Sequence, residues 1–126
     1  MYKRQLRAYG TTKLENILHA REIARRWADD DITAASFHPG VVASEFGRDG
    51  FVTGLLYRSP LRRFLISSEQ GASPLVDLAS RPDLAATNGV YFNRHKPHGK
   101  TAGQADDAEL ARGLWDRSVA LLGHAR

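Results

Sequence analysis

The stretch Y-G-T-T-K-L-E-N-I-L-H-A-R-E-I-A-R-R-W-A, residues 9–28, carries the strongest fold signal in the chain. Its apolar residues recur at steps of three and four, with the charged residues largely on the opposite side. The apolar positions are Leu14, Ile17, Leu18, Ala20, Ala24, Trp27 and Ala28. This period predicts an amphipathic α-helix that packs against another element. We expect residues 1–8 to be a polar lead-in outside the helix.

Tyr9 and Lys13 stand four positions apart at the start of this helix. Residues at that spacing lie one turn apart on the same helical face. A phenol has a pKa of about 10, so it exchanges protons poorly at neutral pH unless a cation stabilises the phenolate. With Lys13 as that cation, Tyr9 would suit general acid/base chemistry at a carbonyl or alcohol oxygen. The same spacing also arises by chance on structural helices, so the pair alone leaves both interpretations open.

The composition describes one soluble globular domain over residues 1–126, with 42% hydrophobic and 25% charged residues. The chain has no cysteine, which excludes disulfides and thiol catalysis and is typical of a cytoplasmic protein. Its net charge of +4 comes from scattered basic residues without a nucleic-acid-binding motif. We therefore expect a cytoplasmic protein with no nucleic-acid partner.

A compact apolar segment, I-T-A-A-S-F at 32–37, follows three aspartates that should end the helix. Its composition predicts a buried strand. His38, Pro39 and Gly40 should end that strand, because proline cannot donate a ladder hydrogen bond and glycine lets the backbone approach a ligand. Ligands of open α/β sheets bind at the carboxyl ends of strands. The turn is therefore a candidate ligand loop, or an ordinary strand-ending turn.

A second helix is predicted to begin after Ser67 or Ser68, either of which could cap it. Ser67 and Gln70 have the spacing of a capping box, and Pro82 should end the helix. The segment G-V-Y-F at 89–92 then predicts a short strand. The buried side of the second helix is expected to consist of Ala72, Leu75, Val76, Leu78 and Ala79.

A polar loop at 93–104 is predicted to lead to the final helix. Two histidines in this loop stand three apart without a third ligand nearby, so we expect no metal site. Asp106 and Glu109 should cap the final helix, and Gly123 should end it. Its packing side is expected to consist of Leu110, Leu114, Trp115, Val119 and Leu122.

Four segments resemble, in order and spacing, the carboxyl-terminal part of the short-chain dehydrogenases/reductases. They are A-Y-G-T-T-K-L-E-N at 8–16, H-P-G-V-V-A-S at 38–44, G-V-Y-F at 89–92 and A-x-x-L-W-x-x-S at 111–118. The resemblance is to the retinol-dehydrogenase-like branch and covers nearly the whole chain. It implies a single partial α/β domain, the carboxyl-terminal half of a Rossmann-like doubly wound parallel sheet. About two strands and three to four helices would be present, without the amino-terminal half.

The resemblance also implies roles for individual residues and a nicotinamide cofactor, NAD or NADP. Tyr9 would be the catalytic acid/base, and Lys13 would lower its pKa and hydrogen-bond the nicotinamide ribose. The residues that match the loop holding the nicotinamide carboxamide and adjoining phosphates are Pro39, Gly40, Val42 and Ser44. Serine at the last position keeps the hydroxyl of the family's usual threonine.

Residues 45–66 are apolar, basic and interrupted by glycines. The family places a mobile substrate lid here, which implies a small apolar carbonyl or alcohol substrate. The part at 55–66 also suits contact with a membrane surface, or plain packing. The lid residues would be Phe51, Leu55, Leu56, Tyr57, Phe64 and Leu65.

Two features of the family are not found in this sequence. No two of the eleven glycines stand two apart, so the dinucleotide glycine fingerprint is missing, and residues 1–8 contain no serine for the catalytic position. We therefore expect an incomplete cofactor site and an oxidoreductase that is inactive alone. The alternative is a non-catalytic remnant or a helix-mediated interaction module. The helix at 9–28 would then pair with a second copy or with a complementing amino-terminal half.

Overall fold

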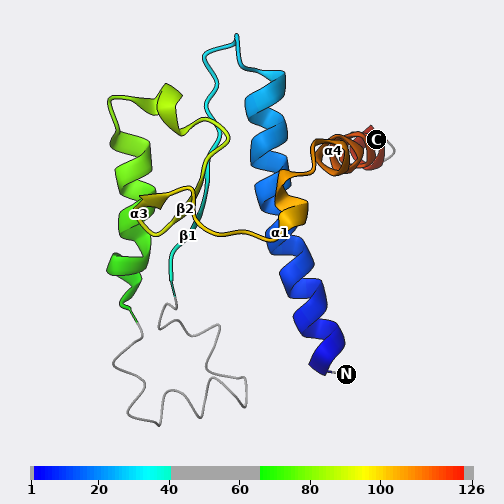
Figure 1. The fold of residues 1–126 in the computed structure, drawn as a ribbon, viewed down its shortest axis with the longest axis horizontal. Coiled ribbons are helices and arrows are strands. Elements are labelled where there is room, and N and C mark those ends of the chain that lie inside the picture. The colour runs from blue at the N-terminus through cyan, green and yellow to red at the C-terminus, as the bar shows by residue number, and fades with distance from the viewer. Residues whose placement is uncertain (1, 41–65, 124–126) are drawn as a thin grey trace.

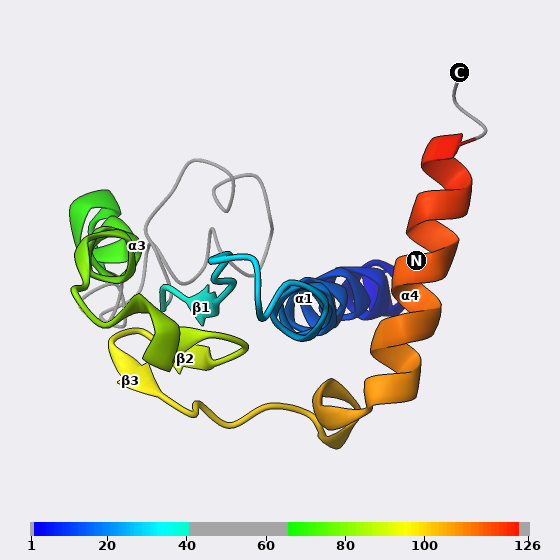
Figure 2. The same cartoon turned by 90° about the horizontal axis from the view of Figure 1, so that it is seen from above.

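The computed structural model describes residues 2–40 and 66–123. In both views the strands lie between α3 and α1, and α4 lies beside α1 (Figures 1 and 2). This is an α/β arrangement, as the sequence predicts. The elements are α1 (Tyr2–Arg26), β1 (Ser36–His38), α3 (Ser68–Ser80), η3 (Leu84–Thr87), β2 (Tyr91–Asn93), β3 (Lys96–Pro97), η4 (Gly103–Asp106) and α4 (Ala108–Gly123), with η marking 3-10 helices.

Helix α1 begins at Tyr2, so the prediction of a lead-in outside the helix is wrong. Residues 3–8 are mostly lysine, arginine, glutamine, leucine and alanine, which are good helix formers and extend the helix without tertiary support. The carboxyl end is near the predicted one, because α1 ends at Arg26 and the chain turns over 27–31. Leu18 and Ala20 are buried as expected, whereas Ala28 is exposed. No helix in the described ranges is long and apolar enough to cross a membrane.

The sheet is small and mixed. β1 pairs in parallel with β2, with Phe37 opposite Phe92, and β2 pairs antiparallel with β3. Strand β3 was not predicted, since it lies in the expected loop at 93–104. The parallel pair agrees with the predicted sheet type, and the antiparallel strand departs from it.

Strand β1 is shorter and less buried than the predicted strand at 32–37. Ile32 is exposed, and no residue of β1 is fully buried. The chain opposite residues 32–35 is a turn rather than a strand. There the Ala34 N–H donates to the Asn88 side chain at 3.0 Å, and the Ala34 carbonyl accepts from Gly89 N–H at 2.7 Å. The ladder therefore begins only at Ser36.

Helix α3 begins with the predicted capping box. Gln70 N–H donates to Ser67 Oγ at 3.2 Å, and Ser67 N–H donates to Gln70 Oε1 at 2.9 Å. The predicted buried side is wrong, because Gly71 and Pro74 are buried while all but one of the predicted residues are exposed. Small residues allow an element to approach closely, so they can form a contact side that a hydrophobicity pattern misses. The exposed residues are Ala72, Leu75, Val76 and Ala79, with Leu78 half-buried.

Helix α4 is capped by Asp107 rather than by Asp106 and Glu109. Asp107 Oδ1 accepts hydrogen bonds from the N–H groups of Glu109 at 3.0 Å and Leu110 at 2.9 Å. Asp106 instead forms an ion pair with Arg21 of α1 at 2.5 Å. The helix ends at Gly123 as predicted. Ala111 is buried and Leu114 and Trp115 are half-buried, but Leu110, Val119 and Leu122 are exposed against expectation.

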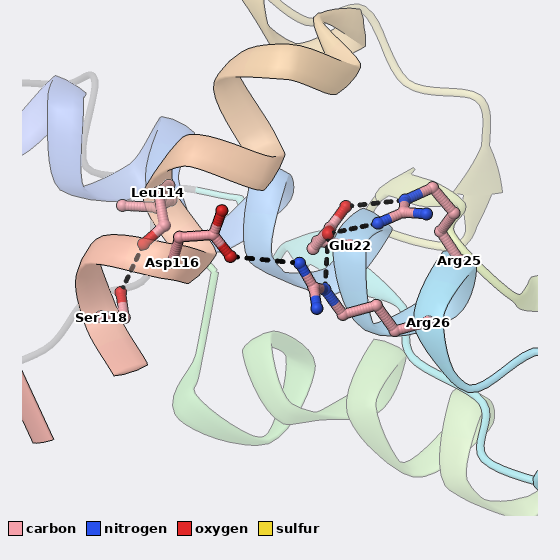
Figure 3. A network of polar contacts seen from close by, with 6 residues as sticks. All are labelled: Glu22, Arg25, Arg26, Leu114, Asp116 and Ser118. Carbon is pink, nitrogen blue, oxygen red and sulfur yellow. Dashed lines mark hydrogen bonds and ion pairs between the residues drawn. The ribbon is translucent and has the colours of Figure 1, made fainter. Parts of the chain in front are cut away.

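A charged network fixes α4 to the carboxyl-terminal half of α1 (Figure 3). Glu22 is only 1% exposed and accepts two hydrogen bonds from Arg25, at 2.6 and 3.0 Å. Arg26 donates to Glu22 at 2.6 Å and to Asp116 of α4 at 3.3 Å. The hydrogen bond from Arg25, supported by Arg26, lowers the pKa of Glu22 to about 2. The ionised carboxylate therefore joins the two arginines, one of which reaches α4.

Candidate active site

The two predicted proton-transfer residues lie together on the amino-terminal half of α1. Lys13 Nζ lies over the Tyr9 ring, 5.3 Å from its centroid. The Tyr9 side chain is 57% exposed. Two nearby hydroxyls are occupied within the helix, because Thr12 donates to the Tyr9 carbonyl at 2.8 Å and Thr11 to the Arg7 carbonyl at 3.0 Å. The structure thus brings Tyr9 and Lys13 together and leaves the phenol accessible.

The carboxyl end of β1 has a backbone conformation that requires glycine. Gly40 has φ of +99°, a value that side chains with a Cβ rarely adopt. A Cβ at this position would also lie 3.1 Å from Ile66 Cδ1. The strand end is fixed from the neighbouring strand, because Arg94 N–H donates to the His38 carbonyl at 2.8 Å. The turn after β1 therefore requires a residue without a Cβ, and the Ile66 side chain lies against it.

The two candidate elements lie at the same end of the molecule. Helix α1 runs antiparallel to β1, so the amino-terminal half of α1 and the carboxyl end of β1 point the same way (Figure 1). Helix α4 lies beside the other half of α1 (Figure 1), where its Trp115 stacks on His19 and its Asp116 accepts a hydrogen bond from Arg26. This leaves the half of α1 that carries Tyr9 uncovered by α4. The Tyr9–Lys13 pair and the Pro39–Gly40 turn therefore lie at one end of the molecule.

The remaining predicted site residues lie outside the described ranges, so their roles stay predictions. They are Val42 and Ser44 of the nicotinamide loop and Phe51, Leu55, Leu56, Tyr57, Phe64 and Leu65 of the lid. Within residues 2–40 and 66–123, no group of three or more histidine, aspartate or glutamate side chains is placed to hold a metal ion.

Asn88 positions the site elements, and the sequence analysis missed it. Its Oδ1 accepts from Ala34 N–H at 3.0 Å, and its Nδ2 donates to the Ala24 carbonyl at 3.4 Å. One half-buried side chain thus joins α1, the chain before β1 and the chain before β2. The signal was present as the Asn88-Gly89 pair, a strong turn signature, and Gly89 has φ of +73°.

The sequence of the chain was compared with those of known proteins. No family model matches the chain. A protein named as a daunorubicin C-13 ketoreductase from Streptomyces sp. (strain C5) is 40% identical over 116 residues, which cover 92% of this chain and 38% of that protein. Retinol dehydrogenase 12 of Mus musculus is 39% identical over 118 residues, with 92% and 36% covered. Retinol dehydrogenase 13 of Homo sapiens is 36% identical over 121 residues, also with 92% and 36% covered.

The chain is homologous to the short-chain dehydrogenases/reductases of the retinol-dehydrogenase type. The resemblance predicted from Tyr9, Lys13 and the Pro39–Gly40 turn is therefore confirmed. The prediction of an oxidoreductase lineage is confirmed as well, because the relatives are named as dehydrogenases and a ketoreductase. The chain spans 36–38% of the length of these short-chain dehydrogenase/reductase relatives.

Proposed function

We propose that this chain provides the proton-transfer and nicotinamide-loop elements of an NAD(P)-dependent oxidoreductase acting on a small apolar carbonyl or alcohol. The observation that carries the proposal is the Lys13–Tyr9 pair on α1, at the same end of the molecule as the Pro39–Gly40 turn. The names of the relatives support the reaction class, because a retinol dehydrogenase acts on an alcohol and a ketoreductase on a ketone.

Tyr9 is the proton-transfer group in this proposal. Its accessible hydroxyl would donate a proton to a carbonyl oxygen during reduction, or accept one from an alcohol during oxidation. Lys13 would stabilise the negative charge that develops on the phenol oxygen as the proton leaves. A bound nicotinamide dinucleotide would supply or accept the hydride.

The residues at the end of β1 fit a nicotinamide cofactor. Gly40 adds no side chain of its own, so a planar ring or a phosphate would approach its backbone from the side away from Ile66. Pro39 and Gly40 would hold the cofactor on this side, and Lys13 would bind its ribose. By the family resemblance, Val42 and Ser44 would complete the loop, and the apolar residues between 51 and 65 would cover the substrate.

The test measures thermal unfolding of the 126-residue chain with saturating NADH or NADPH. A ligand that binds only the folded state at a hundred times its Kd adds about 2.7 kcal/mol of stability. We expect one cofactor to raise the melting temperature, and Gly40→Ala to abolish the rise. Tyr9→Phe should keep the rise, because it removes only the reacting hydroxyl. A melting temperature unaffected by either cofactor would contradict the proposal.

Turnover is tested with retinal and with daunorubicin, the carbonyl compounds that the names of the relatives suggest. The chain has no dinucleotide glycine fingerprint and should be inactive alone, so the rate of NAD(P)H oxidation is measured with a complementing amino-terminal half present. Tyr9→Phe should lower that rate by about 10²–10⁴-fold, the usual contribution of a general acid/base. Tyr91→Phe is the matched control and should leave the rate unchanged. Equal rates in wild type and Tyr9→Phe would exclude Tyr9 as the acid.

A second candidate function rests on the exposure of α1. Side chains at 3–5 and 7–13 are all exposed, so the amino-terminal half of the helix offers a free surface for another helix. In this alternative the chain is an interaction module that pairs α1 with a second copy. Sedimentation equilibrium decides it: a dimer that Tyr9→Glu dissociates would support pairing, and a monomer at all concentrations would exclude it.

A further inference from the structure

Ser73, His95 and Asp77 form a chain of contacts that is separate from the Tyr9 site. Ser73 Oγ lies 3.3 Å from His95 Nε2, and His95 Nδ1 lies 3.5 Å from Asp77 Oδ2. We propose that Ser73 is an activated nucleophile, with His95 as its base and Asp77 as the residue that positions the imidazole. This inference is independent of the proposed oxidoreductase function.

The fold brings the three residues together from two elements. Ser73 and Asp77 lie four positions apart on α3, which places them on one helical face. His95 comes from the two-residue turn between β2 and β3, where Asn93 pairs with Lys96. Arg94, the first turn residue, has φ of +58°, although tight hairpin turns favour glycine or asparagine there. This left-handed residue completes the turn that presents His95 to α3.

The orientation of the imidazole is the one that nucleophilic serine sites use. A carboxylate facing Nδ1 favours the tautomer with the proton on that nitrogen, which leaves Nε2 as an acceptor for the serine hydroxyl. A serine within a helix commonly donates to the carbonyl four residues earlier. Ser80 of the same helix does so, with Val76 at 2.8 Å, whereas Ser73 Oγ faces the histidine.

The site is accessible to small molecules but poorly equipped for turnover. The side chains of His95 and Asp77 are 49% and 48% exposed, and Ser73 is exposed. In α/β-hydrolases, the N–H of the residue after the nucleophile stabilises the oxyanion. Here that residue is Pro74, which has no N–H. We therefore expect a serine that reacts once with an activated acyl ester and releases the acyl group slowly.

With p-nitrophenyl acetate we expect an acyl transfer to Ser73. Ser73 Oγ forms a bond to the acetyl carbon, and its proton passes to His95 Nε2. The bond between the acetyl carbon and the nitrophenyl oxygen breaks, and p-nitrophenolate leaves. The imidazolium then returns the proton to water. The products are acetyl-Ser73 and one equivalent of p-nitrophenolate.

The experiment follows p-nitrophenolate release by the 126-residue chain and locates the acetyl group by peptide mass spectrometry. We expect about one equivalent of acetyl on Ser73. Ser73→Ala should abolish it, and His95→Gln should slow it at least tenfold. The matched controls are Ser80→Ala on the same helix and His98→Gln just after β3, both of which should acylate like wild type. Acetylation on lysines alone, or a Ser73 rate unchanged in concentrated urea, would overturn the proposal.

The positioning role of Asp77 is tested separately from folding. Asp77→Asn removes the charge with little change in shape, and it should slow acylation of Ser73 several-fold. Asp77→Glu restores a carboxylate and should recover part of the rate. If both variants acylate like wild type while unfolding at the same temperature, Asp77 does not position His95. If only the melting temperature changes, the cluster is a structural tie and Ser73 is not activated.

Discussion

Trp115 of α4 stacks on His19 of α1, with ring centroids 5.0 Å apart and planes 29° from parallel. The same indole meets Trp27 edge to face at 5.3 Å, and the Arg26 guanidinium lies over it at 5.0 Å from the centroid. Three side chains from one end of α1 and the turn after it thus converge on one residue of α4. Together with the Glu22 network, they hold α4 against the half of α1 opposite to Tyr9.

Trp115→Ala should destabilise the chain by about 2–3 kcal/mol, because it removes a half-buried aromatic that contacts two rings and a guanidinium. Trp115→Phe should cost clearly less, since it retains one ring. The measurement is the free energy of unfolding from urea titrations. Leu122→Ala is the control, because that side chain is 73% exposed and should change stability by less than about 0.5 kcal/mol. Equal losses in the two alanine variants would contradict the central role of Trp115.

Glu22 predicts a specific loss of stability in acid. The hydrogen bonds from Arg25 and Arg26 lower its pKa from 4.5 to about 2. A group with a lower pKa in the folded state contributes stability above its unfolded pKa and loses it as the pH falls. We therefore expect its contribution to be complete above pH 4.5 and to disappear between pH 4.5 and about 2. Glu22→Gln should flatten this part of the stability profile.

Arg25→Ala provides the check on that explanation. Arg25 is the largest cause of the low pKa of Glu22, so its removal should shift the acid transition toward higher pH. If the midpoint of the acid transition is unchanged in Arg25→Ala, the loss of stability in acid comes from carboxylates other than Glu22.

Two neighbouring aspartates at the start of α4 should differ in their effect on helicity. Asp107→Ala removes the side-chain acceptor of two N–H groups and should cost about 1 kcal/mol with some loss of helical circular dichroism. Asp106→Ala removes a partly exposed ion pair with Arg21 and should cost about 0–1 kcal/mol without loss of helix. A larger helical loss in Asp106→Ala would restore the capping role that the sequence predicted for it.

Two glycines should respond to alanine in opposite directions. A Cβ at Gly99 would lie 2.9 Å from backbone and side-chain atoms of Asn93 and from Tyr91 Cε1, so Gly99→Ala should destabilise by about 1–3 kcal/mol. Gly113 lies inside α4 with nothing within 4 Å, so Gly113→Ala should stabilise by roughly 1 kcal/mol. The melting temperatures of the two variants, each compared with wild type, test this pair of predictions. A Gly99→Ala variant as stable as wild type would show that the hairpin shifts readily.

Local interactions account for what the sequence predicted well. The capping box of Ser67 and Gln70 needs only four residues, and a helix fixes Tyr9 and Lys13 as neighbours once it forms. For the same reason, the sequence predicts the end of α1 and the strand-ending Pro39–Gly40 turn near their observed positions. Each of these features depends on contacts between residues a few positions apart.

Features set by distant contacts could not be predicted in the same way. The buried side of α3 is defined by Gly71 and Pro74, small residues that a hydrophobic pattern passes over. Strand β3 depends on a left-handed Arg94, a conformation that arginine rarely adopts. Asp106 pairs with Arg21, 85 positions earlier in the chain, so the local capping pattern around it could not predict its role. Packing and pairing between elements decided these positions.

The parallel pairing of β1 with β2 has a consequence for the order of folding. Asn88, which binds the backbone ahead of β1, lies 54 positions after its partner Ala34. Closing so long a loop costs chain entropy before the contacts form, whereas α1 and the β2–β3 hairpin need only local contacts. We therefore expect β1 to join after these local elements have formed, so that the Pro39–Gly40 turn takes shape late in folding. A ligand at that turn would stabilise a part of the chain that forms only after its local elements.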